Sequence, residues 1–347
     1  NDQPTITTVD VEGAVTENST VADDPNTVDV ETGGYLVDTG SVTFADVDDS
    51  DVLTSTVTFV SATESAGSAE VATALESALT SAVSISQTGD NDGTIGWTFS
   101  IPDSVAQYIG EGETVTAVYR IALTDDSGEA NDQATQDITV VLTGTNDQPT
   151  ITTVDVNGAA LEDSVTSIDG TDYLVDTGSV TFAETDETDV VVSSVEFVEA
   201  VAGDGALGVS AALETALETG VGLTQTGTND GTIAWRFEVE NDLVQYLAPG
   251  ETVTVTYRVT VDDQSGTDSA TQTQDVTVQI VGTNDAPEIN VASSTSTGTL
   301  TENFDTDEGT DGVQLIATGA ISFSDVDETD GPLASVSLAG EDVTLAY

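Results

Sequence analysis

The sequence predicts a mainly β protein made of tandem β-sandwiches, each carrying one or two short helices. Three observations predict this fold class: a long internal repeat, segments that alternate Val, Ile, Thr and Tyr with polar residues, and Gly- and Asn-rich turns between those segments. The chain has 347 residues, which is enough for two or three domains that each close their own core.

The internal repeat begins at a linker. The stretch TGTNDQPTIT at 143–152 repeats the first residues of the chain, NDQPTIT, and GTNDAPEIN follows at 282–290. Large side chains recur 138 residues apart, at Tyr35 and Tyr173, Phe44 and Phe182, Trp97 and Trp235, Tyr108 and Tyr246, and Tyr119 and Tyr257. We therefore expect folded repeats at 1–145 and 146–283 and the first half of a third at 284–347, with seven extra residues of the first repeat in a polar loop between Glu17 and Tyr35.

Strands are expected where β-branched and aromatic residues alternate or run together. The segments 113–123, 137–144 and 251–261 have this pattern. Asn-Asp-Gly precedes the strands at 89–99 and 227–237 and predicts hairpin turns, because these residues tolerate positive φ.

One helix per repeat is expected among the strands. In SAEVATALESALTSAV, at 68–83, the apolar side chains fall at helical spacing, and the pattern recurs from Val209 to Leu217. A second, shorter helical turn is expected at 102–110 and at 241–250. We expect all of these to pack on the sandwich as part of its core.

The charge of the chain is strongly negative. It has 64 acidic residues against three Arg residues, with no Lys and no His, for a formal net charge of −61. Such a surface repels nucleic acid and anionic membranes and favours cations as partners. A disordered acidic tail has a similar charge, but 37% of the residues are hydrophobic and they are regularly spaced.

The chain has no Cys, so it has neither disulfides nor thiolate metal sites. It also has no apolar run near the roughly 20 residues of a membrane-spanning helix, and its start is polar. We expect no membrane insertion in this segment, and for an exported protein we expect the targeting signal outside it.

Acidic residues recur at fixed places in each repeat. A Glu follows the first strand, at Glu17, Glu162 and Glu302. A cluster follows the Phe-containing strand, at Asp46, Asp48 and Asp51, then Glu184, Asp186 and Asp189, then Asp325, Asp327 and Asp330. A pair precedes the last strand, at Asp125 and Asp126 and at Asp262 and Asp263, and each linker carries Asn and Asp, at Asn1 and Asp2, Asn146 and Asp147, and Asn284 and Asp285.

The direction of the strands predicts where these residues meet. If the first strand ends at the bottom of the sandwich, the Phe-containing strand ends at the top, and the turn before the last strand is also at the top. We therefore expect one joint to gather Glu17, Asn146, Asp147, Glu184, Asp186, Asp189, Asp262 and Asp263.

Seven carboxylates at one joint repel one another strongly. Two carboxylates about 4 Å apart repel by on the order of 4 kcal/mol at an effective dielectric constant of about 20. Oxygen ligands at this density, without nitrogen or sulfur, suit Ca²⁺, so each joint is predicted to bind calcium. The simpler interpretation is that Asp, Asn and Gly are ordinary turn residues, and we apply it to the Asn-Asp-Gly hairpins.

The combined motifs resemble the VCBS repeats of bacterial surface adhesins. The resemblance rests on the GTNDxP linkers, the downstream TEN, DxD after a Phe-containing strand, QYI or QYL before an ETVT turn, and DDxSG before the last strand. It covers both full repeats and the start of the third. The resemblance implies cadherin-like or Ig-like Greek-key sandwiches and calcium ligands at the acidic positions named above. It also implies RTX-type (type I) export and a place on the bacterial cell surface. Repeat two departs at Glu184, where the other repeats have Asp, and this changes the reach of one ligand.

The preferred function is a calcium-stiffened extender that holds an adhesive domain away from the cell in adhesion or biofilm formation. An enzyme is not expected, because without His, Cys and Lys only a glycosidase-like carboxylate pair remains. Calcium-dependent glycan binding would need an exposed aromatic platform, and self-association through strand edges is a further alternative. The three Arg residues, Arg120, Arg236 and Arg258, are expected to pair with local carboxylates.

Overall fold

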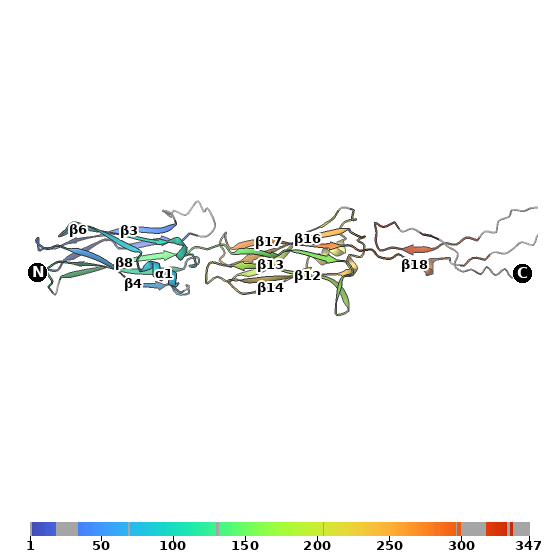
Figure 1. The fold of residues 1–347 in the computed structure, drawn as a ribbon, viewed down its shortest axis with the longest axis horizontal. Helices are drawn as coiled ribbons and strands as arrows, with labels where there is room; N and C mark the ends of the chain where they lie inside the picture. The colour runs from blue at the N-terminus through green and yellow to red at the C-terminus, as the bar shows by residue number, and fades with distance from the viewer. Residues whose placement is uncertain are drawn as a thin grey trace, which may run out of the picture.

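The structure is a computed structural model, and it describes residues 2–18, 34–68, 70–129, 132–203, 205–295, 297–299, 317–331 and 334–335. Two β-sandwiches follow one another along the long axis of the molecule, and a short pair of strands continues the row (Figure 1). We call residues 5–143 the first module and residues 150–281 the second module. Joint 1 lies between them, and joint 2 lies between the second module and the segment that starts at residue 284.

The first module has two sheets packed face to face. Its strands are β1 (Thr5–Asp10), β2 (Glu12–Thr16), β3 (Tyr35–Ala45), β4 (Thr54–Glu64), β5 (Val83–Thr88), β6 (Asp92–Pro102), β7 (Thr114–Thr124) and β8 (Gln133–Thr143). One sheet has the order β1-β3-β6-β5 and the other β2-β8-β7-β4; β2 runs parallel to β8, and the other neighbours are antiparallel. This is the Greek-key order of an Ig-like sandwich, with the first strand divided between the sheets.

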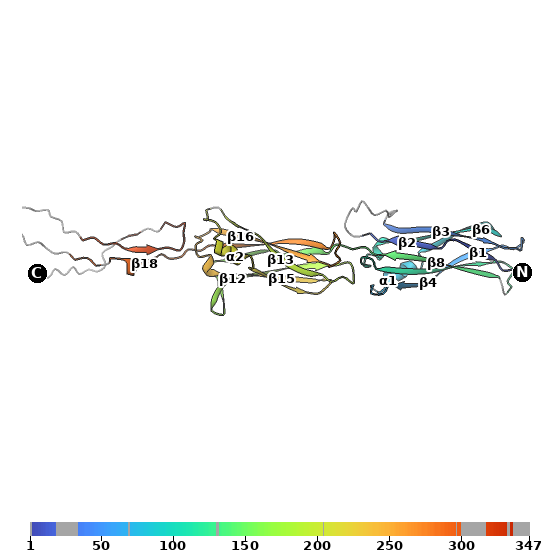
Figure 2. The same ribbon diagram turned by 180° about the vertical axis from the view of Figure 1, so that it is seen from behind.

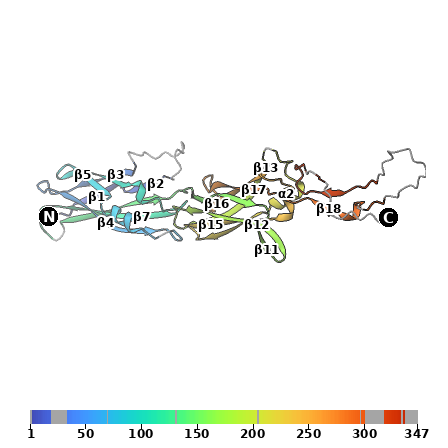
Figure 3. The same ribbon diagram turned by 45° about the vertical axis from the view of Figure 1, so that its right-hand side comes forward.

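The second module repeats the arrangement. Its strands are β9 (Thr150–Asp155), β10 (Asn157–Leu161), β11 (Val165–Ile168), β12 (Thr171–Ala183), β13 (Val192–Ala202), β14 (Val221–Thr226), β15 (Gly231–Glu240), β16 (Thr252–Asp262) and β17 (Thr271–Val281). The additional strand β11 forms a hairpin with β12 that projects from the sandwich (Figure 3). The corresponding loop of the first module, with the seven extra residues, lies outside the described residues.

The core of each module lies between its two sheets and contains the repeated large side chains. Trp97 is 2% exposed and Trp235 is 1% exposed. The indole N–H of Trp97 donates to the carbonyl of Asp10 at 2.8 Å, and that of Trp235 donates to Asp155 at 2.7 Å. Both rings are therefore satisfied core residues, as the alternation of the strands predicts.

The predicted helices form, but they are shorter than the apolar spacing indicates. They are α1 (Thr73–Leu79) and α2 (Ala211–Leu217), with the 3₁₀ turns η1 (Asp103–Val105) and η2 (Asn241–Leu243). Leu75 and Leu79 of α1 are fully buried. The helix stops before Val83 because that residue begins β5 and pairs with Phe99. Each α-helix lies at the end of its module that faces the next one (Figure 2).

The third repeat begins as the first one does. Strand β18 (Glu288–Asn290) pairs with β19 (Ser322–Ser324), and the 3₁₀ turn η3 (Val291–Ser293) follows β18. Glu288 lies opposite Ser324, just as Thr5 lies opposite Ala45 in the first module. The prediction of tandem β-sandwiches with short helices is therefore confirmed.

The three Arg residues pair with carboxylates on the strands, as predicted. Arg120 pairs with Asp137, Arg258 with Asp275, and Arg236 with Glu238. In the described part of the chain, no helix has the length and apolar character of a membrane span.

Candidate metal centre at the joints between modules

Joint 1 is built around Glu17, which follows β2 and is 1% exposed. Its Oε1 accepts hydrogen bonds from the amide and the hydroxyl of Thr145, both at 2.6 Å. Its Oε2 accepts from Nε2 of Gln107 at 2.6 Å. The side chain therefore ties the end of the first module to the linker that leaves it.

Glu162 has the same role at joint 2. It is 1% exposed, its Oε2 accepts from the amide of Thr283 at 2.7 Å, and its Oε1 accepts from Nε2 of Gln245 at 3.0 Å. The repeated linker motif thus forms the same contacts twice.

The linker Asp is joined to the middle Asp of the following acidic loop in all three copies. The amide of Asp147 donates to Oδ2 of Asp186 at 2.8 Å. The equivalent bonds join Asp2 to Asp48 at 2.7 Å and Asp285 to Asp327 at 2.8 Å. Asn1 lies outside the described residues, as does Glu302.

Asn146 closes joint 1 on the side of the second module. Its Nδ2 lies 3.2 Å from Oδ2 of Asp263 and 3.1 Å from the hydroxyl of Ser269. Asn146 is 3% exposed and Asp263 is 2% exposed. At joint 2, Asn284 is exposed.

Hydrogen bonds within the loop fix the shape of all three acidic loops, and the Asn of the neighbouring hairpin also binds the first two. The carboxylate of Asp46 accepts from the amide of Asp48 at 2.9 Å, and Glu184 and Asp325 make the same bond to Asp186 and Asp327 at 3.3 and 3.2 Å. Nδ2 of Asn229 donates to the carbonyl of Asp186 at 2.8 Å, as Asn91 does to Asp48 at 2.9 Å. The Asn-Asp-Gly hairpins therefore also position the acidic loops, which their turn propensity alone does not predict.

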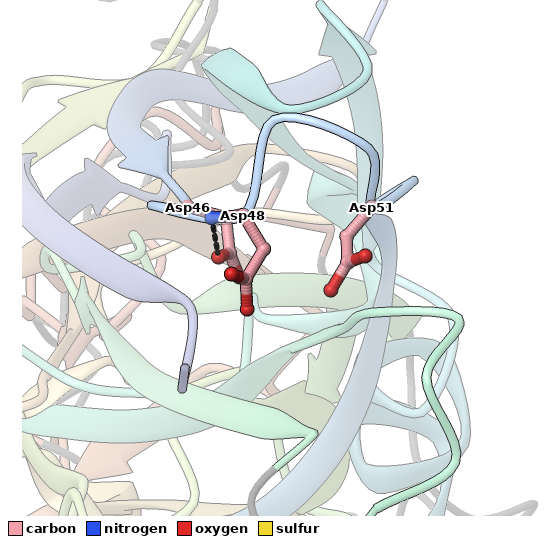
Figure 4. A group of neighbouring side chains, drawn as sticks. All are labelled: Asp46, Asp48 and Asp51. Atoms are coloured by element: carbon pink, nitrogen blue, oxygen red, sulfur yellow. Dashed lines mark hydrogen bonds between the residues drawn. The ribbon is translucent and has the colours of Figure 1, made fainter. Parts of the chain in front are cut away.

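The acidic loop of the first module lies beside the start of the described chain, at Asp2. Ligand atoms of Asp46, Asp48 and Asp51 all lie within 4.8 Å of one another. In Figure 4 the carboxylates of Asp46 and Asp48 lie side by side, and that of Asp51 lies across from them. Asp48 is half-buried here, whereas Asp186 at joint 1 is fully buried. The middle Asp of the loop is thus more buried at joint 1, whereas the first residues of the two loops, Asp46 and Glu184, are 9% and 7% exposed.

The two Asp residues before the last strand differ in position. Asp125 and Asp263 occupy equivalent places and are 5% and 2% exposed. Asp262 instead accepts a hydrogen bond from the amide of Gln264 at 2.8 Å within its own turn, and Asp126 accepts from the amide of Val52 at 3.0 Å. Only one residue of each pair is therefore buried at the module end.

Two further carboxylates lie beside the buried Glu residues, and the motif search missed them. Oδ1 of Asp103 accepts from the amide of Asn18 at 3.2 Å, and its Oδ2 accepts from Gln107 at 3.0 Å. At joint 2 the equivalent carboxylate belongs to Asp163, which accepts from Asn241 and Gln245. Asp103 corresponds to Asn241, and Asn18 corresponds to Asp163. Each repeat therefore has one Asp and one Asn at these two positions, and comparing both positions together indicates the two carboxylates.

The linker passes so close to the turn after η1 that Gly is required. A Cβ atom on Gly144 would lie 1.9 Å from the carbonyl oxygen of Ile109, and one on Gly282 would lie 2.4 Å from that of Leu247. The Gly of the GTND linker therefore allows the joint to close.

Burial and mutual repulsion disfavour the ionised form of the carboxyl groups at joint 1. Burial is the largest cause and raises the pKa of Glu17 to about 8 and that of Asp186 to about 8. The pKa of Glu184 is raised to about 7 and that of Asp189 to about 6, again mainly by burial and then by neighbouring carboxylates. At joint 2, burial raises the pKa of Glu162 to about 7.

Several buried oxygen atoms at these places accept no hydrogen bond from the described residues. They are Oδ2 of Asp46, Oδ1 of Asn146, Oε2 of Glu184, Oδ1 of Asp186, Oδ2 of Asp189, Oδ2 of Asp285 and Oδ1 of Asp327. Buried polar atoms without a partner are costly and rare in folded proteins. All of these atoms belong to residues that the sequence predicts as metal ligands, and a cation is the partner that fits them.

No protein-family model matches the chain, and no curated protein matches it. Similar solved structures include mouse cadherin-23 EC22-24, with 14% identity, a TM-score of 0.34, and coverage of 92% of this chain and 78% of that one. The titin domains Z1Z2 in complex with telethonin have 13% identity and a TM-score of 0.28, with 81% and 98% coverage. The adhesive subunit CfaE of CFA/I fimbria of enterotoxigenic Escherichia coli has 11% identity and a TM-score of 0.29, with 57% and 65% coverage. These values are too low to transfer a function, and the fold follows from the sheets described above.

Proposed function

We propose that the chain is a segment of a bacterial surface adhesin in which calcium stiffens the joints between successive β-sandwiches. The observation that supports this most directly is a set of buried oxygen atoms at joint 1 that accept no hydrogen bond from the described residues, on Asn146, Glu184, Asp186 and Asp189. They lie on the linker and on the acidic loop of the second module, and the linker is hydrogen-bonded through Thr145 to Glu17 of the first module. A cation bound there would connect all three.

The protein has no positive side chain to neutralise this site. The chain contains three Arg residues and neither Lys nor His, and all three Arg residues pair with carboxylates on the strands. The charge at the joint must therefore be balanced from solution, by protons or by metal ions. At neutral pH and millimolar calcium, the metal ion is the stronger competitor for clustered carboxylates.

The donor set fits calcium better than other common metal ions. Every candidate ligand is a carboxylate or an amide oxygen, which hard cations prefer. Calcium accepts six to eight oxygen ligands in flexible geometry, whereas magnesium requires a small, near-octahedral set. At joint 1 the residues that would hold calcium are Glu17, Asp103, Asn146, Asp147, Glu184, Asp186, Asp189 and Asp263. Bound calcium would supply attraction between modules and no catalytic step.

A stiff row of modules is suited to act as a spacer. Strands of 11 residues with a rise of about 3.3 Å per residue make each module roughly 36 Å long. Extracellular modules bind calcium with dissociation constants of about 10⁻⁴ to 10⁻³ M, so such joints are filled outside a cell and empty inside it. This difference, together with the resemblance to VCBS repeats, supports a type I export route followed by stiffening at the cell surface, in cell adhesion or biofilm formation.

Small-angle X-ray scattering of the chain tests this proposal. In calcium at about ten times the dissociation constant, each independent ion adds roughly 1.4 kcal/mol to the closed joint. We expect a longer, more rigid particle in calcium and a more compact, flexible one in EDTA. The variant Asp186→Asn/Asp189→Asn is the matched control and should lose the response of joint 1. An unchanged maximum dimension of the native chain would contradict the proposal.

A further inference from the structure

Joint 1 contains two direct hydrogen bonds between the modules that require no cation. The amide of Glu187 donates to the carbonyl of Tyr108 at 3.2 Å. The hydroxyl of Thr188 donates to Oε1 of Glu113 at 2.7 Å. We call this pair of bonds the clasp: a turn of one module supplies both acceptors, and the acidic loop of the next module supplies both donors.

The clasp recurs at joint 2. The amide of Glu328 donates to the carbonyl of Tyr246 at 3.4 Å, and the hydroxyl of Thr329 donates to Oε1 of Glu251 at 2.8 Å. Because the same atoms meet at both joints, the clasp is a property of the repeat and not an accident of one interface.

The acceptor Glu of the clasp, Glu113 at joint 1, is also held by hydrogen bonds to its own turn and to the linker. Its second oxygen, Oε2, accepts from the amide of Gly110 at 3.3 Å, and at joint 2 Oε2 of Glu251 accepts from the amide of Ala248 at 3.0 Å. The backbone of Glu113 is also held, because its carbonyl accepts from the linker amide of Gly144 at 3.0 Å. One carboxylate oxygen therefore caps its own turn while the other points across the joint.

The backbone acceptor is anchored to the body of its module. The hydroxyl of Tyr108 accepts from the amide of Ala72, just before α1, at 2.9 Å. In the second module the hydroxyl of Tyr246 donates to the carbonyl of Gly208, just before α2, at 2.8 Å. The QYI and QYL turns thus connect the clasp to the helices at the module end.

The outer end of the first module provides an internal comparison. Ser50 occupies the position of Thr188 and Thr329 in its acidic loop. Its hydroxyl lies 3.3 Å from Oδ1 of the adjacent Asp51. A hydroxyl is therefore present at this position in all three copies.

We propose that the clasp sets the relative orientation of successive modules. The Glu of the Gly-Glu-Thr turn in one repeat accepts a hydrogen bond from the Ser or Thr at the fifth position of the acidic loop in the next repeat. The partner it fits is another repeat of the same type, carrying that hydroxyl. The inference rests on the end-to-end stacking in the proposed function but not on calcium. It gives the joint a preferred orientation before any ion binds, so calcium stabilises an arrangement that already exists.

Pulsed dipolar spectroscopy in EDTA tests the clasp. The chain has no Cys, so Ser86→Cys and Thr224→Cys, at equivalent exposed positions of β5 and β14, accept one spin label each. The labels would lie roughly 40 Å apart, about one module length. We compare the labelled chain with its Thr188→Ala, Thr188→Ser and Thr185→Ala variants; Thr185 is the control, a Thr of the same loop outside the clasp.

In EDTA, Thr188→Ala should broaden the distance distribution, with a roughly two- to tenfold fall in the ratio of clasped to unclasped orientations. Thr188→Ser and Thr185→Ala should match the parent chain. The inference is overturned if Thr188→Ala leaves the distribution unchanged, or if Thr185→Ala broadens it equally. Adding calcium tests the proposed function separately. If Thr188→Ala broadens the distance distribution in EDTA but calcium does not narrow it, the clasp is supported and calcium stiffening is rejected. If calcium narrows the distribution but Thr188→Ala has no effect in EDTA, calcium stiffening is supported and the clasp is rejected.

Discussion

Asp163 and Asn241 hydrogen-bond each other at the end of the second module. The amide of Asp163 donates to Oδ1 of Asn241 at 3.0 Å, and Nδ2 of Asn241 donates back to Oδ1 of Asp163 at 2.9 Å. In the first module the equivalent residues are Asn18 and Asp103, with the carboxylate at the other position. Each joint therefore keeps one carboxylate beside its buried Glu, supplied from either side of the pair.

Because the carboxylate occupies a different position of the pair at each joint, we expect that it can be transferred from one position to the other without loss of calcium binding. Asp163→Asn should weaken calcium at joint 2 by about 10- to 100-fold, because a carboxylate next to the site is removed. The double variant Asp163→Asn/Asn241→Asp should recover most of the affinity. Calorimetric calcium titration measures both effects. A double variant as weak as the single one would show that the two positions are not equivalent.

The assignment of the acidic loops predicts that each joint loses calcium independently. Asp186→Asn/Asp189→Asn should abolish millimolar calcium binding at joint 1, since both side chains carry buried oxygen atoms that accept no hydrogen bond from the described part of the chain. Asp327→Asn should weaken joint 2 alone. NMR titration of amide signals assigned to each module distinguishes the joints. Equal losses at both joints from either variant would contradict the assignment.

The raised pKa values predict that the calcium-free protein becomes less stable as the pH rises. Glu17 and Asp186 titrate at about 8 in the folded chain against ordinary values of 4.5 and 3.8. The folded chain therefore keeps protons that the unfolded chain loses between about pH 4 and pH 8, so their contribution is present in full below this window and is lost through it. In EDTA, the thermal midpoint should be lower at pH 8 than at pH 5.

Glu17→Gln is the matched variant for this pH effect. Because Gln stays neutral, the variant should show a smaller fall in midpoint between pH 5 and pH 8, together with weaker calcium binding. A native midpoint in EDTA that rises over this range would mean that the buried carboxyl groups are not the source of the pH dependence.

The close approach of the linker predicts a steric effect at Gly144. Gly144→Ala would place a Cβ 1.9 Å from a carbonyl oxygen, so the linker must move and joint 1 should open. Gly222→Ala is the control, because a Cβ there meets no atom within 4 Å. Chemical denaturation and scattering in calcium compare the two variants. We expect Gly144→Ala either to lower the free energy of unfolding by several kcal/mol or to open joint 1. Equal behaviour of the two variants would contradict the steric role of Gly144.

Much of the fold follows from local sequence. Alternating strands such as β7 and β16 agree with the structure because burial on one face of a strand imposes a period of two. The hairpins that Asn-Asp-Gly predicts also form, but the residue with positive φ is the Gly before the motif, Gly89 or Gly227. The buried position of Trp97 and Trp235 follows from the same period of two. The full length of the predicted helix at 68–83 does not, because Val83 pairs with Phe99 and sheet pairing prevails over helical spacing.

The parts of the joint that could not be predicted depend on contacts between segments far apart in sequence. Nothing local distinguishes Asp263 from Asp262, yet only Asp263 faces Asn146 across the joint. Asp103 belongs to no recurring acidic motif, because Asn241 replaces it in the next repeat. Glu113 recurs as Glu251 in the ETVT turn, but the turn itself does not indicate that this side chain reaches the acidic loop of the next module. Their place at the joint becomes visible only once the modules are stacked.

Anomalous diffraction would show whether calcium occupies the joints between the modules. Crystals of the chain grown in millimolar calcium would be measured at a wavelength at which calcium scatters anomalously. The account predicts peaks at joint 1 among the oxygen atoms of Glu17, Asp186 and Asp263. An anomalous map without a peak there, with the carboxyl groups in the same closed arrangement, would contradict it.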